Sequence, residues 1–153
     1  MPPPEPRAPL RLVVDASVGI KLFLNEALSD RAASLFDQLQ AQPPAQLYVP
    51  DLFFIECASI LTKHVQRFGY PAASAAQDLS ALRQLRLRSV STAELMATAL
   101  QLALAQRLSA YDAAYVTLAQ RLQIPLITAD ERLVRATAPQ GLPVHWLGSY
   151  LGL

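Results

Sequence analysis

The chain has 153 residues and a mass of 16.7 kDa, and 52% of its residues are hydrophobic, so it can bury the core of one domain. Its 13 basic and 12 acidic residues give a net charge of +1, which by itself neither indicates nor excludes a nucleic-acid partner. Cys57 is the only cysteine, which excludes an intramolecular disulfide and a cysteine-based zinc site. No apolar run is long enough to span a membrane, so we expect a cytoplasmic protein without membrane contact.

The first nine residues differ in composition from the rest of the chain. They contain five prolines and no continuous apolar stretch, which is not the pattern of a signal peptide. We expect a flexible, exposed N-terminal tail at residues 1–9 and a single domain over residues 10–153.

Short strands and longer helices alternate along that domain. Five segments of three or four residues have strand character: 12–14, 47–49, 88–90, 125–128 and 144–146. The strand signal is weakest at 88–90. Segments with helical periodicity or helix start and stop signals lie at 18–24, 29–40, 51–68, 72–84, 91–105, 109–122 and 130–135. Because this alternation is typical of strands joined by helical crossovers, the sequence predicts an α/β fold with a parallel sheet.

Four carboxylates stand at positions that such a sheet tends to bring together: Asp15, Glu56, Asp112 and Asp130. Asp15 and Asp130 each follow a strand and precede a helix, and Asp112 lies three residues after Ser109 at a helix start. For each of these three taken singly, capping of a helix N-terminus is the more common role.

Glu56 does not fit a capping role, because it lies inside a helix among mostly apolar neighbours. A buried and unpaired carboxylate is costly, so Glu56 must meet a cation, share a proton or face solvent from a helix edge. A salt bridge to Lys63 or Arg67, further along the same helix, is the alternative to a functional role.

The chemistry follows if the four carboxylates converge. At about 5 Å separation and an effective dielectric constant of about 20, each like-charged pair costs roughly 3 kcal/mol, so the cluster needs a counter-charge. An all-oxygen ligand set is what Mg²⁺ or Mn²⁺ prefers, and these ions take phosphate oxygens as further ligands. The expected chemistry is metal-assisted hydrolysis of a phosphodiester.

Four motifs, in this order and at this spacing, resemble those of the PIN-domain ribonucleases, and specifically the VapC-like toxins of bacterial toxin–antitoxin pairs. They are Leu12–Ser17 (LVVDAS), Pro50–Glu56 (PDLFFIE), Ser109–Tyr115 (SAYDAAY) and Leu126–Leu133 (LITADERL). The resemblance covers residues 10–146 and implies a three-layer α/β/α domain around a mainly parallel sheet of about five strands.

The resemblance also implies roles for particular residues. Asp15, Glu56, Asp112 and Asp130 would bind one or two Mg²⁺ or Mn²⁺ ions and activate a water that cleaves RNA. Hydroxyl residues recur near these acids in the family, so Ser17, Ser109 and Thr128 are candidates for orienting a carboxylate, water or phosphate, with helix capping as an equal alternative. Arg132 stands where some relatives carry a further acid, which leaves the number of metal ions open.

The same resemblance implies an RNA substrate, an antitoxin protein that blocks or distorts the acidic site, and a homodimer. Five basic residues are candidate phosphate contacts, with a solvated helical face as the alternative: Lys63, Arg67, Arg83, Arg86 and Arg88. Apolar residues near the first helix could form a partner surface, although core packing is the more common role for most of them: Leu22, Phe23, Leu24 and Leu28.

Two other functions compete with the nuclease. A haloacid-dehalogenase-like phosphotransfer enzyme would use Asp15 as a nucleophile, but the second aspartate expected two residues later is Ser17 here. A PIN-like scaffold that has lost its activity would not need the intact acids. Phosphate-loop and dinucleotide-binding proteins are excluded, because the five glycines form no Gly-rich turn.

Overall fold

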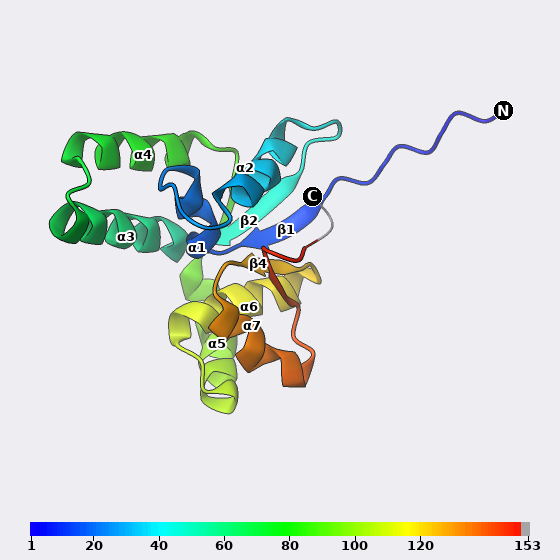
Figure 1. Ribbon diagram of the computed structural model, residues 1–153. Helices are drawn as coiled ribbons and strands as arrows, with labels where there is room; N and C mark the ends of the chain where they lie inside the picture. The colour runs from blue at the N-terminus through cyan, green and yellow to red at the C-terminus, as the bar shows by residue number, and fades with distance from the viewer. Residues whose placement is uncertain (151–153) are drawn as a thin grey trace.

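A computed structural model describes residues 1–150 and places a five-stranded sheet at the centre of the protein (Figure 1). The strands are β1 (Arg11–Val14), β2 (Gln46–Pro50), β3 (Arg88–Val90), β4 (Leu126–Thr128) and β5 (Val144–Trp146). They lie in the order β3-β2-β1-β4-β5, and every neighbouring pair is parallel. The prediction of a parallel α/β sheet is confirmed. Because β1 is central, its carboxyl end lies between those of β2 and β4, where open α/β sheets place their sites.

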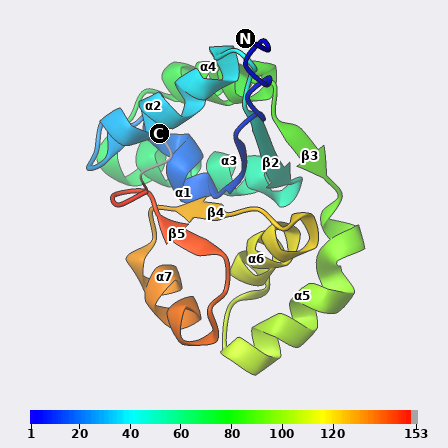
Figure 2. The same ribbon diagram turned by 90° about the vertical axis from the view of Figure 1, so that its right-hand side faces the viewer.

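Helices cover both faces of the sheet (Figures 1 and 2). One face carries α1 (Ala16–Gly19), α2 (Ser29–Asp37), α3 (Leu52–Phe68) and α4 (Ala72–Gln84), and the other carries α5 (Thr92–Gln106), α6 (Ala110–Leu122) and α7 (Glu131–Thr137). Short 3₁₀ turns extend three of these helices: η1 (Ile20–Leu22), η2 (Gln38–Gln40) and η3 (Ala138–Gln140). The result is the three-layer α/β/α arrangement that the sequence predicts.

The core explains why these segments form these elements. Leu12, Val13 and Val14 are completely buried, as expected for a central parallel strand with helices on both faces. Residues 113–119 of α6 are all buried, because this helix lies between the sheet and α5. Leu24 is buried, and Leu22, Phe23 and Leu28 pack against the core, which favours the packing role for these four residues.

Gly19 sets the approach of α1 to α3, the helix that carries Glu56. A Cβ atom added at Gly19 would lie 2.6 Å from the ring of Phe53, a buried residue of α3. Gly19→Ala is therefore expected to destabilise the protein by about 1–3 kcal/mol, because this overpacking outweighs the helix propensity gained with alanine. Thermal unfolding measures the change, and an unchanged melting temperature would mean that the ring can move aside freely.

The N-terminal segment contains no helix or strand before Arg11, and residues 1–8 are exposed. Figure 1 shows this segment extending away from the sheet. Among residues 1–150, no helix is both long and apolar enough to cross a lipid bilayer.

Candidate active site

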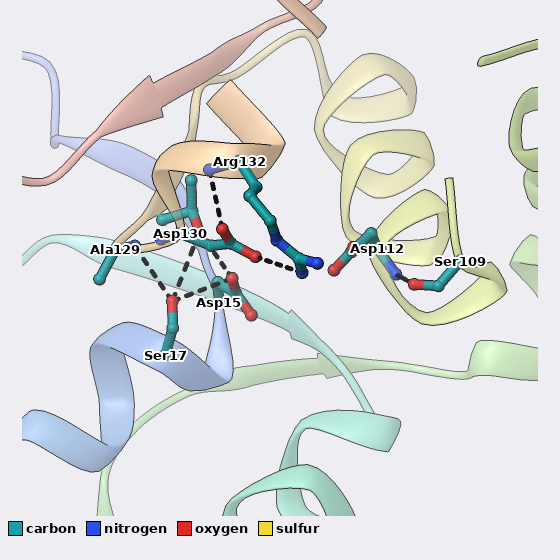
Figure 3. A network of polar contacts seen from close by, with 8 residues as sticks. Asp15, Ser17, Ser109, Asp112, Ala129, Asp130 and Arg132 are labelled. Atoms are coloured by element: carbon teal, nitrogen blue, oxygen red, sulfur yellow. Dashed lines mark hydrogen bonds and ion pairs between the residues drawn. The ribbon is translucent and has the colours of Figure 1, made fainter. Parts of the chain in front are cut away.

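Asp15 follows β1 and is buried at the carboxyl edge of the sheet. Its Oδ2 atom accepts hydrogen bonds from the hydroxyls of Thr128 at 2.7 Å and Ser17 at 3.0 Å (Figure 3). Burial raises the pKa of Asp15, because these hydrogen bonds offset only part of the cost of removing the carboxylate from water. The Asp15 side chain makes no capping hydrogen bond to α1, so the capping alternative is wrong for this residue.

The hydroxyls of Ser17 and Thr128 connect Asp15 to the loop between β4 and α7. Each donates to Asp15 and also accepts a backbone N–H from that loop. The N–H of Ala129 donates to Ser17 Oγ at 3.0 Å, and the N–H of Asp130 donates to Thr128 Oγ1 at 3.0 Å. Each hydroxyl donates one hydrogen bond to Asp15 and accepts one from the loop backbone, so the two side chains fix the backbone of Asp130 relative to Asp15.

Thr128→Val tests this connection with a side chain of nearly the same shape. The change leaves the N–H of Asp130 without its acceptor and removes one of the two hydroxyl donors to buried Asp15. We expect a loss of about 1–3 kcal/mol in the free energy of unfolding. Thr137→Val is the control, because Thr137 is equally buried but its hydroxyl donates only to carbonyls of its own helix. Equal losses in the two variants, measured by urea unfolding, would contradict the role assigned to Thr128.

Glu56 lies on α3 with one buried carboxylate oxygen, Oε1, that has no hydrogen-bond partner among the described residues. Burial, reinforced by the negative charge of Asp15, raises the pKa of Glu56 to about 7. The hydroxyl of Tyr115 lies close enough to act against this shift, although it forms no hydrogen bond of ordinary geometry. Within residues 1–150, neither Lys63 nor Arg67 forms an ion pair, so the salt-bridge alternative for Glu56 is wrong.

Asp112 lies in the first turn of α6. Its N–H donates to the hydroxyl of Ser109 at 3.0 Å, so Ser109 caps the helix and the Asp112 side chain does not. The carboxylate points towards Asp130 and Arg132 instead (Figure 3). Burial raises the pKa of Asp112, and the charge of Asp130 adds to the increase.

Asp130 both caps a helix and forms an ion pair. Its Oδ1 atom accepts the N–H of Arg132 at 2.9 Å, which confirms the capping alternative for this residue, and its Oδ2 atom lies 3.2 Å from Arg132 Nη2. Burial alone would raise the pKa of Asp130, but the hydrogen bonds and charge of Arg132 together lower it. Asp130 is therefore the one of the four acids that already has a cationic partner within the described chain.

Two clefts open at the site, one beside Asp112 and the other beside Glu56. Asp112 lines a cleft of about 310 Å³ together with Arg107, Leu108, Ser109, Arg132, Leu133 and Ala136. Glu56 lines a second cleft of about 320 Å³ together with Ile55, Ser59 and Tyr111. Tyr111 and Asp112 are consecutive in the first turn of α6, so this turn contributes one residue to each cleft.

The predicted phosphate contacts fall into two groups. Lys63 and Arg67 are exposed on α3, about two and three turns beyond Glu56 and on the same side of the helix. The others lie away from the acids: Arg83 in the last turn of α4, Arg86 before β3, and Arg88 at the amino end of β3. Only the α3 pair therefore extends directly from the acidic site.

The comparison with known proteins decides the family. The PIN domain family model matches residues 12–139. The chain belongs to the PIN domain family. Ribonuclease VapC3 from Pyrobaculum aerophilum is 35% identical to this PIN domain over 126 residues, which cover 81% of this chain and 92% of the relative. The resemblance recognised in the sequence is confirmed, and membership of this family leaves no support for the haloacid-dehalogenase-like alternative.

Solved structures have the same PIN fold. The crystal structure of PAE2754 from Pyrobaculum aerophilum superposes with a TM-score of 0.65 at 20% identity, covering 92% of this chain and 91% of that chain. A toxin–antitoxin complex from Klebsiella pneumoniae contains a chain that superposes with a TM-score of 0.57 at 17% identity, and the match covers 79% of this chain and 88% of that chain. At these identities the similarity supports the fold of this PIN domain.

The four acids of this PIN domain offer only carboxylate oxygens as ligands, which are the ligands that a hard divalent cation prefers. Three of them have raised pKa values at a buried edge, and Glu56 has an oxygen without a partner, so added positive charge would be stabilising. In residues 1–150, however, no three Asp, Glu, His or Cys side chains lie close enough together to enclose an ion. An ion held here would therefore take only one or two of these carboxylates and keep waters as its other ligands, which is a coordination that Mg²⁺ accepts.

Two residues of this site have no clear signal in the sequence. Tyr115 reads as a packing residue, but its buried hydroxyl lies beside Glu56, and burial with the charges of Asp15 and Glu56 raises the pKa of Tyr115. Its position one turn after Asp112 on α6 is the signal that could have placed it at the site. Arg107 follows α5 in the left-handed conformation and lines the cleft of Asp112, which no local pattern predicts.

Proposed function

We propose that this PIN domain is a metal-dependent endoribonuclease and the toxin of a toxin–antitoxin pair. The observation that carries the proposal is the group of buried Asp15 with half-buried Glu56 and Asp112 at the carboxyl edge of the sheet, where burial raises the pKa of each and clefts open at Glu56 and at Asp112. A relative that is 35% identical over most of both chains is named a VapC ribonuclease, which supports RNA as the substrate.

In this proposal Asp15, Glu56, Asp112 and Asp130 hold one or two Mg²⁺ or Mn²⁺ ions. When bound, such an ion lowers the pKa of a water and neutralises charge on the phosphate under attack. Ser17 and Thr128 orient the carboxylate of Asp15 through their hydroxyls. The hydroxyl of Ser109 caps α6 and thereby positions Asp112 at the cleft.

The RNA path follows from the exposed residues around the clefts. We infer that Lys63 and Arg67 contact phosphates, because both are exposed on the Glu56 side of α3 and neither forms an ion pair within the described residues. Tyr111 is 59% exposed beside Glu56 and can stack on an unpaired base. Arg83, Arg86 and Arg88 stay a prediction as phosphate contacts at a more distant surface.

A partner protein is part of the proposal. The structural relative from Klebsiella pneumoniae was solved as a toxin–antitoxin complex, which supports an antitoxin as the protein that controls this site. A homodimer and the boundary between the tail and a domain at residues 10–153 stay predictions. Light scattering of the purified chain measures the first, and limited proteolysis of the N-terminal segment measures the second.

The test is cleavage of a panel of structured RNAs by purified protein with Mg²⁺, with Mn²⁺ and with EDTA. We expect discrete cleavage products with either metal ion and none with EDTA. Cleavage that persists in EDTA would contradict metal dependence. Intact RNA under every condition, from a protein that is folded and binds its antitoxin, would favour the alternative of an inactive PIN-like scaffold.

A further inference from the structure

Arg132 lies between two of the four acids. Its guanidinium nitrogen Nη2 is 3.2 Å from Asp130 Oδ2, and its backbone N–H donates to Oδ1 of the same carboxylate at 2.9 Å. Figure 3 shows the guanidinium between the carboxylates of Asp130 and Asp112. The position between two carboxylates is the one that an incoming cation would be drawn to.

The charge of Arg132 acts on both carboxylates. It contributes to the lowered pKa of Asp130 and acts against the raised pKa of Asp112. In residues 1–150, Arg132 is the only Lys or Arg that forms an ion pair with any of the four acids. Arg107 lines the same cleft but forms no such pair within that range.

The Arg132 side chain is free to leave this position. It is 80% exposed, and the side-chain contact of its guanidinium is the ion pair with Asp130. An ion pair with such exposure adds little stability, and a divalent ion competes with it effectively. The helix cap would survive the movement, because it uses the backbone N–H of Arg132 and not the guanidinium.

We propose that Arg132 is an internal counter-cation of the acidic site, whose ion pair with Asp130 a divalent metal ion must break when it binds beside Asp130 and Asp112. The inference rests on the proposed metal-dependent function. A guanidinium paired with Asp130 and a metal ion beside the same carboxylate repel each other, so the affinity for metal is lower than the acids alone would give. Arg132 is thus a positioning residue that determines the affinity of the site for metal.

The test compares Mn²⁺ affinity by isothermal titration calorimetry, without RNA, in the wild-type protein and two charge-matched variants. Arg132→Gln removes the charge beside the acids. Arg135→Gln removes one charge from the same helix at a residue whose ion pair, at 3.7 Å, is with exposed Glu131. We expect Arg132→Gln to bind Mn²⁺ roughly three- to tenfold more tightly than the wild type, and Arg135→Gln to stay within about twofold.

Arg132→Lys separates charge from the other properties of the side chain. It keeps the positive charge and should bind Mn²⁺ as the wild type does, so a gain equal to that of Arg132→Gln would overturn the proposal. An Mn²⁺ affinity of Arg132→Gln that is equal to or weaker than that of the wild type would also overturn the counter-cation proposal. In that case, measurable Mn²⁺ binding by the wild type would still support the proposed metal-dependent function. If no folded variant and no wild-type protein binds Mn²⁺, the proposed metal site and this inference both fail.

Discussion

Asp15→Asn is expected to abolish RNA cleavage while leaving the fold intact. Asparagine keeps an oxygen that can accept the hydroxyls of Thr128 and Ser17, so the connection between β1 and β4 survives. What is lost is the negative charge at the centre of the carboxyl edge. A catalytic metal site supplies several kcal/mol of transition-state stabilisation, so cleavage should fall by about 10³-fold or more in single-turnover assays with Mg²⁺.

The control for this variant is Asp37→Asn, which removes an equal charge from the exposed last residue of α2. It should cleave RNA at the wild-type rate. Folding of both variants is checked by circular dichroism and thermal melting, and Asp15→Asn should melt no lower than the wild type, because it removes a buried charge. Cleavage at the wild-type rate by folded Asp15→Asn would exclude this carboxylate from the reaction.

Local sequence patterns carry most of the fold. Strand β1 follows from a run of apolar and β-branched residues that starts at Leu12. The end of α3 follows from Gly69, which adopts the left-handed conformation directly after this helix. Their boundaries in the structure fall within a few residues of the predicted ones. The position of β1 at the centre of the sheet was not predicted, because strand order depends on the crossovers between strands and no local pattern encodes it.

Spacing and motif order indicate the four acids as candidate site residues, but they do not predict the contacts of those acids. The hydrogen bond from Thr128 to Asp15 joins residues 113 positions apart, and no local pattern predicts such a contact. The salt bridge considered for Glu56 failed because the nearest cation on α3, Lys63, is about two turns away. Arg132 reaches Asp130 from only two residues away, through a capped helix start.

Distant strands also create an arrangement that the sequence does not indicate. The guanidinium groups of Arg11 and Arg88 lie 5.5 Å and 5.7 Å from the centre of the Tyr48 ring, from strands on either side of β2. The hydrogen bond from Arg11 and the two positive charges lower the pKa of Tyr48. Because each contact depends on the parallel register of three strands, the sequence indicated Arg88 only as one of several candidate phosphate contacts and not as a neighbour of Tyr48.

Glu56→Gln is expected to remove activity and to stabilise the metal-free protein above neutral pH. The pKa of Glu56 is raised from 4.5 to about 7 on folding, so the folded protein favours the neutral carboxyl. That contribution to stability is complete below pH 4.5 and is lost as the pH rises to about 7, so at pH 8 the wild type carries the full cost of the ionised group. Since Glu56 is only half-buried, solvent screening reduces this cost to about 1–2 kcal/mol.

Glutamine does not ionise, so the difference between the two proteins should depend on pH. Melting temperatures measured in EDTA should be nearly equal at pH 4.5, and the variant should melt roughly 2–8 °C higher at pH 8. Glu94→Gln is the control, because the exposed carboxylate of Glu94, on α5, pairs with Arg121 at the other end of α6 from Asp112. This variant should show no such gain in melting temperature at pH 8. Adding Mn²⁺ should reverse the order at pH 8, since the ion stabilises the protein that retains the carboxylate. A variant that melts below the wild type at pH 8 in EDTA would mean that Glu56 is held by contacts stronger than its burial, and that this carboxylate is structural.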